Sequence, residues 1–202
     1  DGRSVLFERV GMPDVLWSVS TQGGDAVRLG PSSRGTGIFS PDGSRILHTV
    51  VQDVGGQGVF IRQIMPANGG EPKVAPALPP RADGLAWTPD GTGITYVHAS
   101  NEFRNLFRLN LATGKSEEIT HFTEGLIGDH AWSPDGKRLL LRRKIGDTSN
   151  LWVTDADGGN PVAVTDFETG TINRAKWSRD GGRIYFTYGE GGQNVVLIRN
   201  FR

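Results

Sequence analysis

The sequence predicts an all-β protein built from the four-stranded antiparallel blades of a β-propeller. Three observations support this fold class. A five-residue motif returns every 45 residues, short apolar segments of strand length stand on either side of it, and no stretch shows the 3.6-residue period of an amphipathic helix. A repeat of about 40–50 residues that holds four short strands is typical of a propeller blade.

The repeated motif is an aromatic residue followed by a tight turn. Asp-Gly between two apolar segments favours a hairpin, because Gly accepts a positive φ and Asp hydrogen-bonds to its own backbone. A proline before the Asp presets φ for the turn, and the last copy has Arg179 instead. The copies are 87–91, 132–136 and 177–181, with a looser one at 39–43, and their shared positions are Phe39, Asp42, Gly43, Trp87, Asp90, Gly91, Trp132, Asp135, Gly136, Trp177, Asp180 and Gly181.

The repeat at 127–165 shows the expected order of strands. A first strand ends at Trp132, the Asp-Gly turn follows, and residues 138–143 form the second strand. A polar loop leads to a third strand at 150–155, and a Gly-rich turn leads to a fourth at 161–165. Because each blade buries its apolar faces only against its neighbours, we expect the motif Trp to pack between blades.

Five repeat units fill the chain, which we expect to form a single propeller region over residues 1–202. The first unit lacks a first strand and the last lacks a fourth, which favours an open arc or part of a larger ring. Such an arc leaves an apolar blade face exposed at each end, so we expect self-association. The approximate units are 1–33, 34–80, 81–126, 127–171 and 172–202.

Composition narrows the range of partners. The 22 basic and 22 acidic residues give a net charge of zero, which argues against binding nucleic acid or an anionic membrane. No apolar run reaches the roughly 20 residues of a membrane span. Cysteine is absent, so thiol chemistry is excluded. The chain opens on Asp1-Gly2 inside a repeat motif, and we expect it to be a piece of a longer protein.

No motif for catalysis, metal binding or a cofactor is found. Gly-x-Ser-x-Gly and His-Glu-x-x-His are both absent. Residues 155–160 resemble a calcium loop, but Gly159 occupies the third ligand position, so a hairpin turn is favoured. We therefore expect a non-catalytic domain without metal or cofactor. The four histidines lie in separate segments, at His48, His98, His121 and His130.

One predicted second strand is strongly basic. A solvated strand face or protection of a sheet edge explains such a run. A surface for an acidic partner is the alternative. The residues are Lys137, Arg138, Arg142, Arg143 and Lys144.

The loops that lead into the first strands differ most in chemistry, while the frame around them repeats. In a propeller these loops form a rim around the central channel, where ligands and peptides commonly bind. Mixed charges there suit a polar peptide or protein segment, and solvated loop ends are the alternative. The predicted rim residues are Arg34, Arg81, Asp83, Asp129, His130, Asn173 and Arg174.

The repeats resemble the WD40-like propeller repeat of the TolB type, whose hallmark is an aromatic-Ser-Pro-Asp-Gly-Lys/Arg turn. Residues 39–43, 87–91 and 132–136 carry this resemblance, which covers essentially the whole chain. It implies a propeller that binds protein or peptide. Propellers of this type occur in TolB, a periplasmic partner of an outer-membrane lipoprotein, in prolyl-oligopeptidase-like peptidases, and in bacterial signalling proteins.

The end of the chain narrows that resemblance. Residues 167–201 resemble the close of TolB-like sensor propellers fused behind bacterial Ser/Thr kinase or winged-helix domains. This resemblance implies a sensor or docking domain in the C-terminal part of a signalling protein, in an extracytoplasmic, periplasmic location, while the absence of cysteine leaves the cytoplasm open. A TolB-like periplasmic scaffold and the gating propeller of a peptidase are the alternatives.

Overall fold

The computed structural model describes residues 2–11, 14–31, 37–100, 103–189 and 194–198. These residues form eighteen β-strands and no helix, so this part of the chain has no helix that could cross a membrane. The chain divides into two compact units, residues 1–77 and 78–202.

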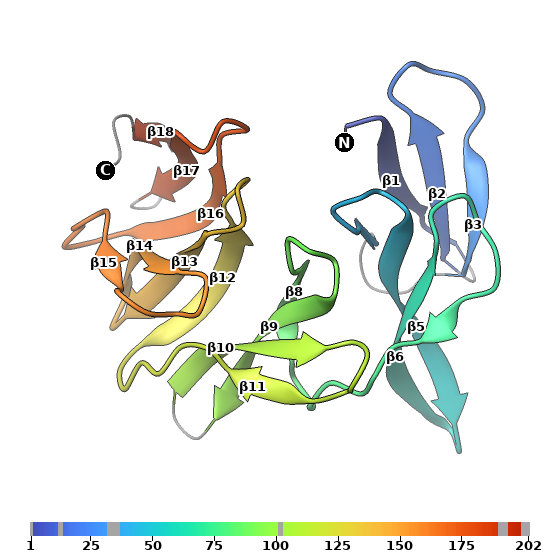
Figure 1. The fold of residues 1–202 in the computed structure, drawn as a ribbon, viewed down its shortest axis with the longest axis horizontal. Coiled ribbons are helices and arrows are strands. Elements are labelled where there is room, and N and C mark those ends of the chain that lie inside the picture. Colours follow the sequence, from blue (N-terminus) through green and yellow to red (C-terminus); the bar gives the residue numbers. More distant parts are fainter. Residues whose placement is uncertain (1, 12–13, 32–36, 101–102, 190–193, 199–202) are drawn as a thin grey trace. The chain divides into compact units, whose positions relative to one another are not determined.

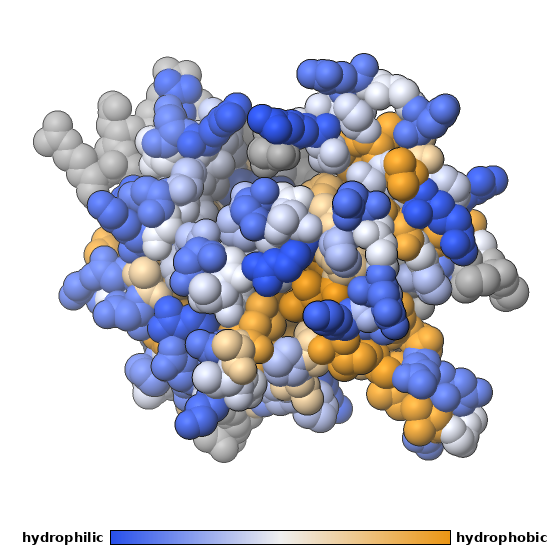
Figure 2. Space-filling view, turned by 45° about the vertical axis from the view of Figure 1, so that its right-hand side comes forward, coloured by the Kyte–Doolittle hydropathy of each residue, from blue (hydrophilic) through white to orange (hydrophobic). Residues whose placement is uncertain are grey.

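The first unit contains a three-stranded and a four-stranded antiparallel sheet (Figure 1). The hairpin of β5 and β6 pairs along ten residues and continues well past the short strands on either side of it. Hydrophobic side chains reach the surface on its outer part, in the lower right of Figure 2. The strands are β1 (Ser4–Arg9), β2 (Val15–Ser20), β3 (Val27–Pro31), β4 (Ile38–Phe39), β5 (Arg45–Val54), β6 (Gln57–Pro66) and β7 (Lys73–Val74).

The second unit contains two four-stranded blades and one three-stranded blade (Figure 1). A single parallel bridge between Arg104 and Leu126 joins the first two blades edge to edge. The strands are β8 (Asp83–Trp87), β9 (Gly93–Ser100), β10 (Phe103–Asn110), β11 (Ser116–Glu118), β12 (Leu126–Trp132), β13 (Arg138–Ile145), β14 (Thr148–Asp155), β15 (Val162–Ala163), β16 (Thr171–Trp177), β17 (Ile184–Gly189) and β18 (Asn194–Ile198).

This arrangement confirms the predicted all-β class and the antiparallel four-stranded blade. Within the described residues, successive blades contain three, four, four, four and three strands. The repeat boundaries and the grouping of all five units into one propeller region stay predictions.

Hydrogen bonds within the Asp-Gly turn explain why its sequence repeats. After β12, Ser133 Oγ donates to Asp135 Oδ1 at 2.6 Å and accepts the Arg138 N–H at 2.9 Å, and Gly136 has a φ of 71°. Hydrogen bonds to the carboxylate lower the pKa of this Asp, so it stays ionised as a strong acceptor. The Ser or Thr to Asp bond, the positive glycine φ and the lowered Asp pKa recur in the turns at Asp42, Asp90 and Asp180.

The turns of the second unit also pack on one another. A Cβ added to Gly136 would lie 2.8 Å from Pro89 Cβ, and one added to Gly181 would lie 3.5 Å from Pro134 Cδ. The motif proline of one blade therefore contacts the motif glycine of the next. The glycine is needed both for its positive φ and, at Gly136, for this close approach.

The motif tryptophans join neighbouring blades. Trp132 packs against a cluster that contains Val97 of the preceding blade, and its Nε1–H donates to Thr95 Oγ1 at 3.1 Å. Trp177 packs against the cluster that contains Leu151 and donates to the Ala131 carbonyl at 3.3 Å. The aromatic side chain that ends each of these first strands is thus a contact to the blade before it.

Candidate functional site

The structure places most of the predicted rim residues within strands, so their assignment to the preceding loops is wrong. The first strands begin earlier than the sequence indicates, because glycine and asparagine inside them resemble loop residues. Asp83 begins β8, Asp129 and His130 lie in β12, Asn173 and Arg174 lie in β16, Arg81 precedes β8 with a φ of 63°, and Arg34 lies outside the described residues.

Each of these first strands is irregular, at matching positions in β12 and β16 and slightly later in β8. The pairing register shifts between Asp83 and Ala86 in β8, between residues 127 and 129 in β12, and between residues 172 and 174 in β16. A β-bulge leaves a residue unpaired and redirects the neighbouring side chains. The residues left unpaired are Gly84 and Leu85 in β8, Gly128 in β12 and Asn173 in β16, so only the bulge of β16 presents a polar side chain.

The predicted rim residues differ in their exposure to solvent and in the partners that they have within the chain. Asp83 forms an ion pair with Arg104 of β10, so its charge is balanced within the blade. Asp129 is half-buried, and its Oδ1 accepts the His130 N–H at 2.9 Å. Asn173 and Arg174 are exposed. A partner can therefore reach the side chains of β16 most directly.

His130 is a structural residue rather than an exposed contact. Its ring is buried, and its Nε2 lies 2.7 Å from Thr95 Oγ1. Burial lowers the pKa of His130 from 6.5 to about 4, because the charged ring would lose its hydration. His130 is therefore neutral at physiological pH and unsuited to bind an external anion.

The histidines and acids do not assemble into a candidate metal centre in the described part of the chain. No group of three His, Cys, Asp or Glu side chains there has the arrangement to hold an ion. His48 lies in β5, His98 in β9 and His130 in β12, while His121 follows β11.

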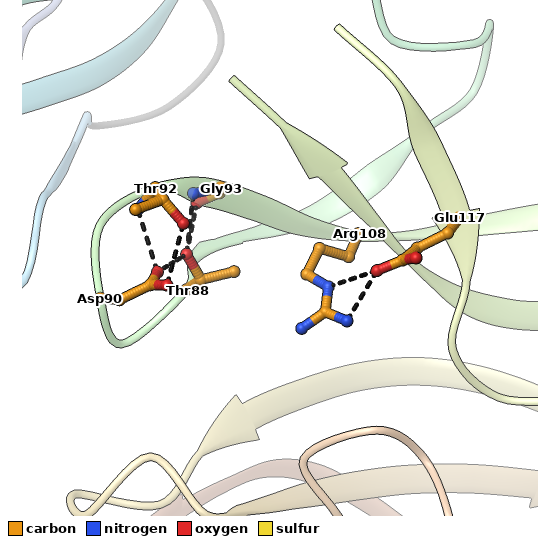
Figure 3. A network of polar contacts seen from close by, with 6 residues as sticks. All are labelled: Thr88, Asp90, Thr92, Gly93, Arg108 and Glu117. Carbon is orange, nitrogen blue, oxygen red and sulfur yellow. Dashed lines mark hydrogen bonds and ion pairs between the residues drawn. The ribbon is translucent and has the colours of Figure 1, made fainter. Parts of the chain in front are cut away.

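A cavity of about 630 Å³ lies at the other end of the strands, beside the Asp-Gly turns. The turn between β8 and β9 forms one side, with Asp90 bound to Thr88 and Thr92 (Figure 3). Arg108 of β10 faces this turn and pairs with Glu117 of β11 at 2.6 Å (Figure 3). The next blade completes the wall with Trp132, Gly136 and Ala156. The sequence analysis missed this cavity.

The TolB beta propeller domain is the family whose sequence model matches the chain, over residues 74–201. This match includes three of the Asp-Gly turns and all strands of the second unit. The chain belongs to the TolB β-propeller family. No curated protein sequence matches it.

Solved structures agree with this membership at the level of the fold. A TolB candidate from Agrobacterium tumefaciens superposes with a TM-score of 0.71 at 20% identity, over 92% of this chain and 70% of that protein. TolB from Acinetobacter baumannii gives 0.74 at 17% identity, over 93% of this chain and 46% of that one. An acylaminoacyl peptidase from Pyrococcus horikoshii gives 0.69 at 16% identity, over all of this chain and 37% of that one.

Two asparagines of this TolB-type propeller have a structural role that the sequence analysis missed. Asn105 Oδ1 accepts the Phe122 N–H and its Nδ2 donates to the Phe122 carbonyl, at 3.0 and 3.1 Å. Asn150 makes the same two bonds with Phe167, at 2.8 and 3.0 Å. Each asparagine thus fixes the segment that leads to the next blade. The signal was available, because the two residues are 45 positions apart.

Proposed function

We propose that this chain is a non-catalytic propeller domain that binds a protein or peptide along the first strands of its blades. The observation that carries the proposal is the bulge in β16, which leaves the polar side chains of Asn173 and Arg174 exposed on a frame of antiparallel strands. Asn173 and Arg174 are the expected principal contacts, and Asp129 is secondary because it is half-buried.

The chemistry of this surface suits a polar segment with at least one acidic group. Arg174 is an exposed guanidinium, which can pair with a carboxylate through two parallel hydrogen bonds. Asn173 beside it offers both a donor and an acceptor to a peptide backbone. His130 is removed from the predicted contact set because it is buried.

We further propose that the domain serves as the sensor or docking part of a bacterial signalling protein, on the extracytoplasmic side of the membrane. The resemblance of residues 167–201 to propellers fused behind kinase or winged-helix domains supports this context. A TolB-like scaffold is the second candidate, supported by the family match. The coding sequence upstream of Asp1 separates the two: a kinase or winged-helix domain supports the sensor, and a signal peptide with no such domain supports the scaffold.

The binding surface is tested with one charge reversal and its matched control. Peptides are selected on the wild-type chain from a phage-displayed random library, and their affinities are then measured by biolayer interferometry. We expect Arg174→Glu to weaken binding about tenfold or more. Arg179→Glu makes the same exchange on an exposed residue in the turn after β16, and we expect it to bind like wild type.

If Arg174→Glu and Arg179→Glu bind the selected peptides with equal affinity, or if both variants bind them with the affinity of wild type, the β16 surface is not the binding site. Circular dichroism of both variants checks that each is folded.

A further inference from the structure

The cavity beside the Asp-Gly turns lies at a blade whose sequence differs from the other blades at one repeated position. The residue two positions after the motif glycine lies at or directly before the start of the second strand of the blade, and it is arginine in three of the four motif-bearing repeats and glycine in the other. These residues are Arg45, Gly93, Arg138 and Arg183. Gly93 lines the cavity, so the cavity lies beside the one motif-bearing repeat that has no arginine at this position.

Arg138 shows what this arginine does where it is present. Its Cζ lies 4.9 Å from the centre of the Trp177 ring, the motif tryptophan of the following blade. A guanidinium over an indole face is attracted by the ring quadrupole. Trp132 is the motif tryptophan one blade earlier. It corresponds to Trp177 and lines the cavity. In the described part of the chain no cation stacks on Trp132.

The carboxylate of Asp90, in the turn beside the cavity, has no arginine at this repeat position as a partner. The positive charge of Arg138 helps to lower the pKa of Asp135, and Arg183 does the same for Asp180. The lowered pKa of Asp90 has hydrogen bonds from Thr88 and Thr92 as its favourable causes, without a cation. Asp90 is exposed, and its hydrogen bonds from Thr88 and Thr92 come from neutral donors.

The chain cannot easily supply the missing side chain itself. A Cβ on Gly93 would lie 2.7 Å from the Leu109 carbonyl oxygen and 3.2 Å from Thr88 Cγ2, so this position excludes a side chain unless the backbone shifts. Arg108 also lines the cavity, but its Nε and one terminal nitrogen bind Glu117 (Figure 3). Lys115, which is exposed, is the remaining cation of the lining.

We propose that this cavity binds the guanidinium group of an arginine side chain from a partner peptide, stacked on Trp132 and facing the Asp90 carboxylate. The planar cation would stack on Trp132 as Arg138 stacks on Trp177 between the next two blades. A cavity of about 630 Å³ is large enough for an arginine side chain together with the backbone that carries it. The site lies at the turn end of the strands, so it does not depend on the binding surface of β16.

The lining also predicts a variant that binds more tightly. Lys115 places a like charge beside an arriving arginine, and its removal should strengthen binding. A gain in affinity cannot come from partial unfolding. Lys137, an exposed lysine in the turn after β12 that does not line the cavity, gives the matched control.

Three capped tripeptides serve as probes: Gly-Arg-Gly, Gly-Lys-Gly and Gly-citrulline-Gly, with free L-arginine as a fourth ligand. Titrations are followed by the Trp132 indole signal in NMR spectra of the whole chain. We expect the arginine peptide to bind at least fivefold more tightly than the neutral citrulline peptide. Lys115→Ala should raise the affinity about threefold, while Lys137→Ala leaves it unchanged.

A pair of turn variants tests the role of the carboxylate. Asp90→Asn and Asp135→Asn remove the carboxylate charge at the same turn position of two neighbouring blades and keep an acceptor oxygen there, but only Asp90 lines the cavity. We expect only Asp90→Asn to lower the affinity for the arginine peptide, by about fivefold. Citrulline or lysine peptides that bind as well as the arginine peptide, tighter binding of free arginine, or no effect of Lys115→Ala would each overturn the proposal.

Discussion

Arg143 and Tyr188 occupy the same repeat position and make the same kinds of contact with different side chains: each stacks on an aromatic ring and donates to a backbone carbonyl. Arg143 stacks on Phe122 and Trp152, at 3.7 and 4.6 Å from the ring centres, and donates to the Glu124 carbonyl. Tyr188, 45 residues later, stacks on Phe167 at 4.1 Å and donates to the Thr169 carbonyl. Arg143 is buried, so the interpretation of its strand as a solvated basic face is wrong at this residue.

The burial of His130 predicts a loss of stability at mildly acidic pH. The folded state holds its pKa at about 4, whereas the unfolded chain has a value near 6.5. Because the unfolded state binds the proton more readily, stability is full above pH 6.5 and falls as the pH drops towards 4. We expect wild type to lose about 2 kcal/mol of unfolding free energy between pH 7 and pH 5 from this residue, measured by chemical denaturation.

His130→Gln keeps a polar group near Thr95 and should abolish this part of the pH dependence. The burial of His48 also lowers its pKa, but this contribution is common to both proteins and cancels in the comparison. His121→Gln, at an exposed site, should follow wild type. A His130→Gln variant that loses as much stability as wild type at pH 5 would show that this ring is not the titrating group.

At the scale of elements, the turn after β14 is fixed by its contact with the blade before it. Gly158 has a φ of 85°, and a Cβ there would lie 1.6 Å from the Ile119 carbonyl oxygen. Gly158→Ala must therefore both strain the turn and push the two blades apart. We expect a loss of about 3 kcal/mol in the free energy of unfolding, measured by urea denaturation.

Gly146→Ala separates these two causes. Gly146 also has a positive φ, of 59°, but no atom lies within 4 Å of its added Cβ. This variant should lose only the cost of the left-handed backbone, about 1 kcal/mol. Equal losses in both variants would mean that the approach of Gly158 to Ile119 adds nothing to stability.

The sequence predicted the elements that depend on local chemistry. The Asp-Gly turns and the four-strand order follow from residues at fixed offsets, such as Asp135 and Gly136, whose hydrogen bonds lie within the turn. The bulges were not predictable, because Gly128 and Asn173 resemble loop residues and interrupt the alternation of a strand. The cavity is lined by Gly93, where the other motif-bearing repeats have arginine, and this difference becomes visible only when the repeats are compared position by position.

At the scale of the whole molecule, self-association through the end blades stays a prediction, and the structure adds another apolar surface to test. The outer part of the β5–β6 hairpin exposes 55% of Val54 and 42% of Val59. Side chains of this kind on a projecting hairpin favour association, because joining two copies removes apolar area from water. We expect the chain to show concentration-dependent dimers or larger species in sedimentation velocity experiments.

A double variant locates the contact. Val54→Lys with Val59→Lys should shift the distribution towards monomer without lowering the unfolding free energy by more than about 0.5 kcal/mol, because both side chains are already exposed. Val27→Lys with Val74→Lys adds the same charge at exposed valines of β3 and β7 and is the control. If both pairs reduce association equally, net charge is responsible. If neither pair does, the hairpin is not the contact, and the end blades remain the surface to test next.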